Sequence, residues 1–124
     1  MADMQWALDG QGTELFAGIP VSDFDRALDW YRRFFGCEPA FFPNDFEAVW
    51  AIGPQRWFYI IVDAGRAGGA VQTLICQDLE PLIATLSARG IDYVAEELPA
   101  EGVRKVMYGD PDGNEIGLGR VPAV

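Results

Sequence analysis

The sequence predicts an α+β fold made of two tandem βαβββ modules. Three observations support this prediction. Two helical segments are each preceded by an extended run and closed by a glycine, a glycine-rich stretch separates them, and the residues around the first helix are repeated around the second. A chain of 124 residues is the usual size of one domain, so we expect a single domain over residues 1–124.

The first module is expected over about residues 14–63. It opens with ELFAGIPV (14–21), which we interpret as a strand. A helix follows over 22–35, with Ser22 as its N-cap, acidic residues in its first turn and Gly36 just past its end. Three further strands complete the module, at 37–42, 45–52 and 56–62, separated by turns at Pro43-Asn44 and Gly53-Pro54.

The second module follows a linker, AGRAGG, at 64–69 and is expected over about residues 70–120. Its expected elements are a strand at 70–76, a helix at 78–89 closed by Gly90, and strands at 92–98, 103–109 and 115–120. The turn sequence GDPDGN joins the last two strands. Asp110, Asp112 and Asn114 in this run could suggest a calcium loop, but the run is too short and lacks that loop's distant glutamate. We therefore predict a tight turn with Gly113 at positive φ.

The two modules repeat each other. Residues 19–28 align with residues 74–83 at an offset of 55. The aligned pairs are Asp23 with Asp78, Phe24 with Leu79, Leu28 with Ile83 and Tyr31 with Leu86. A unit present twice indicates a duplicated module, because a solenoid needs roughly three or more repeats.

Charge and histidine content exclude several classes of function. The 19 Asp and Glu residues outnumber the 9 Lys and Arg residues, so the formal net charge is −10. Nucleic acid and anionic membranes both require a basic face, and we expect neither as a partner. There is no histidine and there are only two cysteines, which rules out Ser-His-Asp and Cys-His catalysis and a four-ligand zinc site of nitrogen and sulfur ligands.

The N-terminal residues carry no recognisable targeting signal. MADMQWALDGQG contains two aspartates and lacks the basic and apolar segments of a signal peptide. The apolar run WFYIIVDA (57–64) is much shorter than the roughly 20 residues that cross a bilayer. We therefore expect a cytoplasmic protein.

Three segments carry a resemblance to a known family: PVSDFDRALDWYRRFFG (20–36), QDLEPLIATLSARG (77–90) and GDPDGNEIGL (109–118). Together with the repeat, they make the chain resemble the vicinal oxygen chelate superfamily, which includes glyoxalase I, extradiol dioxygenases and the bleomycin-resistance proteins. The likeness extends over about residues 14–120. It implies that the modules form a curved mixed sheet shaped as a cup, with the helices outside and ligands inside.

The resemblance also implies four positions at which the family holds a metal ion. They fall on Phe16, near Tyr59, on Val71 or a neighbour, and on Gly117. None of these residues is a histidine or a carboxylate, so we expect no metal and no other cofactor. Metal-dependent glyoxalase or dioxygenase chemistry is therefore disfavoured, since that chemistry uses the ion to stabilise an enediolate or to hold dioxygen and catechol.

Side-chain alternation predicts which residues line the cup. In the last strand of the first module, Phe58, Ile60 and Val62 are expected to pack on a helix, while Trp57 and Tyr59 point the other way. In the last strand of the second module, the same reasoning predicts that Ile116 and Leu118 are buried, and that Glu115 and Gly117 face the cup.

One strand remains ambiguous at this stage. Along 45–52, Phe46, Ala48, Trp50 and Ile52 share a face, but the sequence leaves open which face is the inner one. Asp45 and Glu47 alternate on this strand and are expected to be solvated. The predicted ligand-binding residues are Phe16, Trp50, Trp57, Tyr59, Glu14, Glu115, Val71 and Gly117. The rings would form a stacking platform, with Glu14 or Glu115 as the charge partner of a cation.

The leading interpretation is a metal-independent small-molecule binding protein of the bleomycin-resistance type. The resemblance implies a homodimer that sequesters a planar or cationic compound, as in antibiotic resistance, without catalytic residues. Two alternatives stay open. One is a glyoxalase-like lyase or isomerase that works without a metal and uses Glu14, Glu115 or Tyr59 as acid or base. The other is a degenerate dimerisation module whose cup is filled by its own rings.

Overall fold

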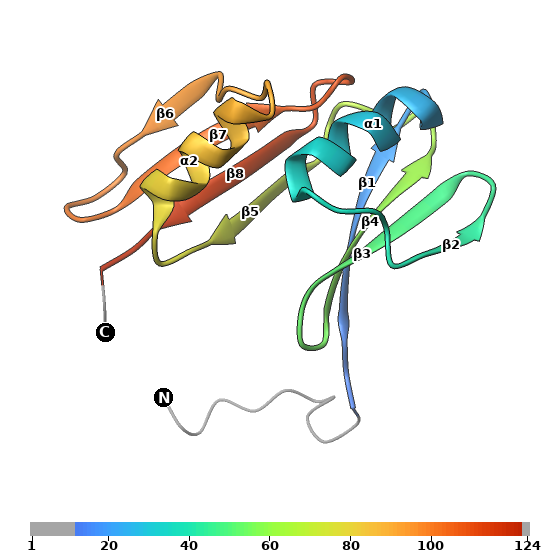
Figure 1. Cartoon of the computed structure of the whole chain (residues 1–124), viewed down its shortest axis with the longest axis horizontal. Coiled ribbons are helices and arrows are strands. Elements are labelled where there is room, and N and C mark those ends of the chain that lie inside the picture. Colours follow the sequence, from blue (N-terminus) through green and yellow to red (C-terminus); the bar gives the residue numbers. More distant parts are fainter. Residues whose placement is uncertain (1–11, 123–124) are drawn as a thin grey trace.

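The computed structural model describes residues 12–122 and contains two modules of the same composition (Figure 1). The first comprises β1 (Leu15–Val21), α1 (Phe24–Phe35), β2 (Phe41–Asn44), β3 (Glu47–Gly53) and β4 (Arg56–Val62). The second comprises β5 (Val71–Ile75), α2 (Leu79–Ala88), β6 (Ala95–Glu97), β7 (Arg104–Gly109) and β8 (Glu115–Arg120). Residues 1–11, which make up most of the N-terminal segment MADMQWALDGQG, lie outside the described residues.

Each module forms its own four-stranded mixed sheet. The strand orders are β1-β4-β3-β2 and β5-β8-β7-β6. In both sheets the first strand of the module runs parallel to the last, and the remaining pairs are antiparallel. This arrangement confirms the α+β class and the duplicated βαβββ unit, since the parallel pair needs the helical crossover that each module supplies.

One face of each sheet packs against the helices. The buried core includes Phe58 and Ile60 from β4, and Ile116 and Leu118 from β8, all of them 3% exposed or less. It continues through the buried faces of α1 and α2, so both modules share it. The burial of these β4 and β8 side chains confirms the predicted alternation. The exception is the end of β4, where Val62 is 37% exposed. Among residues 12–122, no helix lies on the opposite faces of the sheets (Figure 1).

The start of α1 differs from the prediction by one residue. Asp23, not Ser22, is the N-cap, because its carboxylate accepts a hydrogen bond from the Arg26 backbone N–H at 3.0 Å. Ser22 instead donates from its backbone N–H and its hydroxyl to Asp112 in the second module. At the other end, Gly36 adopts the predicted left-handed conformation, with φ of 75°.

The turn between β2 and β3 lies two residues later than the sequence predicts. Pro43 and Asn44 end β2, and the turn lies at Asp45-Phe46, where the Asn44 side-chain oxygen accepts the Phe46 N–H at 3.0 Å. β2 is an edge strand, and an edge strand tolerates a proline because one of its sides needs no ladder hydrogen bond.

The GDPDGN segment is a structural turn that joins the modules. Gly113 has φ of 90°, as predicted. The Asn114 carboxamide is fully buried: its oxygen accepts the N–H groups of Gly68 and Ala70, and its nitrogen donates to the Pro20 carbonyl and to Asp110. The turn therefore ties together the end of β1, the linker and the start of β8. Neither described helix is long and apolar enough to span a bilayer.

Candidate ligand-binding site

An aromatic group lies on the open face of the first sheet, which faces away from α1. The parallel register of β1 and β4 places Phe16 opposite Trp57 and Gly18 opposite Tyr59. The rings of Phe16 and Trp57 are stacked, with centroids 5.4 Å apart and planes 10° apart. The Tyr59 ring lies 6.4 Å from the Phe16 ring, tilted by 60°. The structure therefore brings together three of the four predicted aromatic residues.

Gly18 allows the Tyr59 ring to lie across β1. A Cβ atom at Gly18 would lie 2.5 Å from the ring carbon that carries the hydroxyl and 2.6 Å from the hydroxyl oxygen. Both distances are shorter than a van der Waals contact, so any side chain there would displace the ring. The Tyr59 ring can therefore take this position only because residue 18 is glycine.

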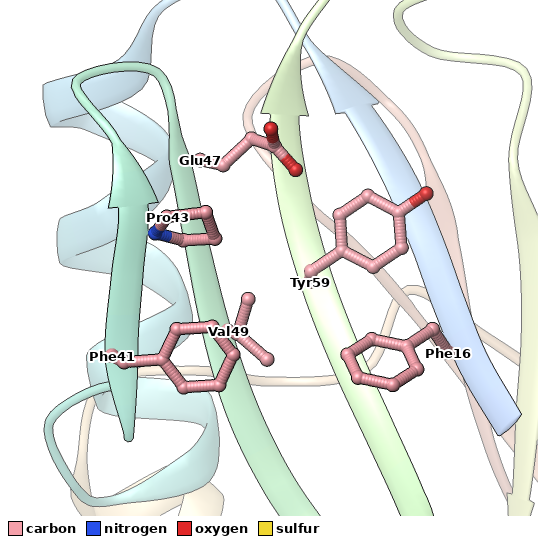
Figure 2. A pocket seen from close by; sticks show the side chains of 6 residues that line it. All are labelled: Phe16, Phe41, Pro43, Glu47, Val49 and Tyr59. Atoms are coloured by element: carbon pink, nitrogen blue, oxygen red, sulfur yellow. The ribbon is translucent and has the colours of Figure 1, made fainter. Parts of the chain in front are cut away.

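A pocket of about 250 Å³ opens beside these rings (Figure 2). Val49 forms its floor and is 2% exposed, while Phe41 and Pro43 from β2 lie on one side, and Phe16 and Tyr59 on the other. The volume is below the roughly 300–1,000 Å³ of pockets that hold drug-sized ligands, so the space suits a group of one or two rings.

Glu47 is the charged residue that lines the pocket. It is half-buried, so the expectation that it lies in solvent is wrong, whereas Asp45 is exposed as expected. The reason is the register of β3, which places Glu47 and Val49 on the open face. The Asn44 side-chain amide donates to the Glu47 carboxylate at 2.7 Å.

Trp50 does not belong to the aromatic group on the open face. It pairs with Phe58 across β3 and β4, and directly opposed residues share a face. It is therefore in the core, 1% exposed, with its indole N–H donating to the Cys37 carbonyl at 3.1 Å. Phe46 is 53% exposed at the β2–β3 turn and does not line the pocket.

Glu14 acts on the aromatic group through Trp57. Its carboxylate accepts a hydrogen bond from the Trp57 indole N–H. This contact orients the indole. Its ring stacks on Phe16 and makes an edge contact with the Phe41 ring, with the two ring centroids 6.0 Å apart. Glu14 and Trp57 therefore support the outer wall of the pocket without lining it.

The remaining predicted site residues lie on the open face of the second sheet. Val71 is 64% exposed at the start of β5 and pairs with Glu115 on β8. The Lys105 ammonium lies 3.5 Å from the Glu115 carboxylate, and its side chain covers Gly117, where a Cβ atom would be 2.7 Å from the Lys105 Cε. None of these residues lines the pocket on the first sheet.

The residues at the family's metal positions do not fit a metal ion. Phe16, Val71 and Gly117 have no side-chain donor atom, so the Tyr59 hydroxyl is the single side-chain donor that these four positions supply, and the Lys105 cation covers Gly117. Within residues 12–122, no group of three or more Asp, Glu or Cys side chains lies close enough together to hold an ion. We therefore derive no reaction step through a metal.

Reasoning from the sequence missed four pocket residues: Phe41, Pro43, Glu47 and Val49. For Glu47 and Val49 on β3, the alternation of side chains is visible in the sequence. Which of the two faces of the strand is the open one depends on the pairing of Trp50 with Phe58. On β2, Phe41 falls within the strand expected over 37–42, whereas Pro43 falls in the expected turn.

Comparison with known proteins was made at both the sequence and the structure level. Scans against protein-family models and curated protein sequences gave no match. Among solved structures, a glyoxalase/bleomycin resistance protein from Catenulispora acidiphila DSM 44928 is 48% identical to this chain. The match covers 89% of this chain and 99% of that one, with a TM-score of 0.85. The chain belongs to the glyoxalase/bleomycin resistance protein/dioxygenase superfamily.

The fold of this superfamily also occurs in two more distant structures. TnmS3, an antibiotic binding protein from Streptomyces sp. CB03234, is 24% identical over 95% of this chain and 100% of its own, with a TM-score of 0.70. Lactoylglutathione lyase from Agrobacterium tumefaciens is 19% identical over 86% of this chain and 91% of its own, with a TM-score of 0.67. Binding proteins and enzymes thus share the fold, so the fold alone does not separate the two functions.

Proposed function

We propose that this superfamily member binds a small planar organic compound in the pocket on the first sheet, without a metal, and acts by sequestering it. The observation that carries the proposal is the pocket itself. It is lined by rings that remain accessible, since Phe16 is 48% exposed and Phe41 is 44% exposed. Stacking of a planar ligand on such rings contributes about 0.5–1.5 kcal/mol for each ring beyond the burial of area.

The chemistry of the surrounding groups supports binding over catalysis. Two of the three groups expected as acid or base in the enzyme alternative are already engaged, Glu14 by the Trp57 indole and Glu115 by Lys105. Sequestration requires affinity only, and the antibiotic-binding function of TnmS3 is a precedent for it on this fold. By extension, we propose a toxic or antibiotic compound as the ligand.

A thermal-shift screen with planar aromatic compounds tests the proposal. A compound present at about 100 times its Kd should stabilise the protein by about 2.7 kcal/mol. Phe16→Ala should abolish the shift, because Phe16 lines the pocket. Phe42→Ala is the matched control, since Phe42 is also 48% exposed but lies outside the pocket. The proposal fails if no compound shifts the transition, or if both variants lose the shift equally.

Independence from metal is checked separately. We expect elemental analysis of the purified protein to show no stoichiometric transition metal, and EDTA to leave ligand binding unchanged. Both results follow from the lack of donor atoms at Phe16, Val71 and Gly117. Stoichiometric zinc, nickel or iron would contradict the proposal.

We also propose that the chain is a homodimer. The open face of the second sheet exposes two aliphatic side chains on β5, Val71 at 64% and Ile75 at 60%, with Thr73 between them. A second copy could cover this part of the sheet, because exposed apolar side chains gather at interaction sites. Sedimentation velocity should give the mass of a dimer, and a monomer at micromolar concentration would refute this proposal.

A further inference from the structure

We propose that Glu47 makes the pocket selective for a positively charged ligand, such as a planar compound that carries an amine. This inference rests on the proposed function, because it concerns the same pocket. It names the residue that recognises the charge and the chemical class that this residue selects. Neither Glu14 nor Glu115, the charge partners expected from the sequence, has this role.

The position of Glu47 is the first argument. Figure 2 shows its carboxylate at one end of the pocket, on the same side of the sheet as the rings of Phe41, Tyr59 and Phe16. A planar group seated between these rings would therefore direct a short substituent at that end toward the carboxylate. Apart from Glu47, the only polar side-chain atom among the lining residues is the Tyr59 hydroxyl oxygen.

The second argument is that Glu47 is held in place before any ligand binds. Asn44 donates to its carboxylate at 2.7 Å, and the oxygen of the same Asn44 side chain accepts the Phe46 N–H at 3.0 Å. Both the nitrogen and the oxygen of the Asn44 side-chain amide are thus hydrogen-bonded at the β2–β3 turn. A carboxylate fixed in this way loses little conformational entropy when it pairs with a ligand, which favours binding.

The third argument is the lack of a counter-charge. Within residues 12–122, eight ion pairs are formed, and Glu47 takes part in none of them. The group hydrogen-bonded to its carboxylate is the neutral Asn44 amide. Glu115 differs, since Lys105 lies 3.5 Å away. A cation from the ligand would therefore be the first positive charge beside Glu47.

The rings and the carboxylate select for the same type of ligand. The faces of aromatic rings attract cations, and a half-buried carboxylate attracts them more strongly than one in bulk water. The same two features disfavour an anionic ligand. A ligand with both a planar ring and an amine would use the whole pocket, whereas a neutral ring would use only its walls.

Three indole compounds of similar shape test the inference: tryptamine, a cation; tryptophol, which is neutral; and indole-3-propionate, an anion. Binding to the full chain is measured by isothermal titration calorimetry. We expect tryptamine to bind about fivefold more tightly than tryptophol, as for a partly exposed ion pair at the upper end of its usual strength. Indole-3-propionate should bind most weakly.

Two variants assign the preference to Glu47. Glu47→Gln keeps the size of the side chain and should lose most of the preference for tryptamine over tryptophol. Asp45→Asn is the matched control: it removes the same charge two residues away, from an exposed side chain outside the pocket, and should keep the fivefold preference. Urea unfolding of both variants checks that they fold like the wild type.

The outcomes separate this inference from the proposed function. If tryptamine and tryptophol bind the wild type equally, or if Glu47→Gln keeps the preference, the inference is overturned and the pocket remains a binding site for planar compounds. If both variants lose the preference to the same extent, the overall charge of the protein is responsible, and the inference is again overturned. If no indole compound binds, the inference is overturned, and the thermal-shift screen decides the proposed function separately.

Discussion

Gly18 and Tyr59 show how one side chain of the pocket is positioned. The Tyr59 ring occupies the space that a side chain at residue 18 would need. The two residues face each other in the β1–β4 register, so the space is available only because one of them is glycine. The wall of the pocket therefore depends on a residue that contributes no side chain to it.

We predict that Gly18→Ala destabilises the protein by about 1–3 kcal/mol, because the added methyl group forces the Tyr59 ring to move. Urea unfolding measures the cost. In a Tyr59→Ala background the same substitution should cost nearly nothing, because the ring is gone. An equal cost in both backgrounds would show that the contact with Tyr59 is not the cause.

At the scale of elements, Tyr31 connects α1 to the GDPDGN turn. Its hydroxyl donates to the buried Asp110 carboxylate at 2.8 Å, and Asn114 donates to the same oxygen. Burial, followed by the charge of Asp110, raises the pKa of Tyr31 far above its ordinary value of 10.0. The link between helix and turn therefore requires a protonated tyrosine.

This link predicts a pH dependence of stability. The folded-state pKa of Tyr31 is raised, so its contribution is fully present below the unfolded value of about 10 and is lost as pH rises further. Tyr31→Phe should cost about 1–2 kcal/mol at pH 7, where it removes one buried hydrogen bond. Above pH 10 the wild type should lose about 1.4 kcal/mol more per pH unit than the variant.

Urea unfolding between pH 7 and pH 11 measures both effects. Tyr108, whose pKa is also raised by burial, is present in both proteins, so its titration cancels in the difference. A constant difference between wild type and variant across this range would contradict the assignment to Tyr31.

At the scale of the whole molecule, the net charge of −10 acts on every charged ligand. Long-range attraction between an acidic protein and a cation is screened by salt, with a Debye length of about 8 Å at physiological ionic strength. The charge therefore adds a salt-dependent contribution to the local contact with Glu47.

We predict that the Kd of tryptamine rises severalfold between about 20 mM and 500 mM sodium chloride, while the Kd of tryptophol changes little. Calorimetric titrations at several salt concentrations measure this difference. If both compounds respond equally to salt, the effect concerns the protein and not the charge of the ligand.

The sequence was sufficient to predict much of the fold. The bounds of the strands over 56–62 and 115–120 were predicted correctly, because period-two alternation is strong where one face is buried and the other is not. The two helices were recognisable from their caps and glycines. The strand expected over 37–42 lies at Phe41–Asn44 instead, because Pro43 and Asn44 are typical of a turn although an edge strand tolerates them.

The sequence by itself determined the superfamily, the duplicated module, the lack of histidine and the aromatic pair Phe16 and Trp57. The superfamily follows from the resemblance of three segments to known members, and the rest follows from local patterns and residue types. Tertiary structure alone decided that Trp50 is buried and that Glu47 lines the pocket. The physical reason is that alternation along a strand defines two faces but does not orient them. Only pairing with Phe58 across the sheet shows which face is turned toward the helix.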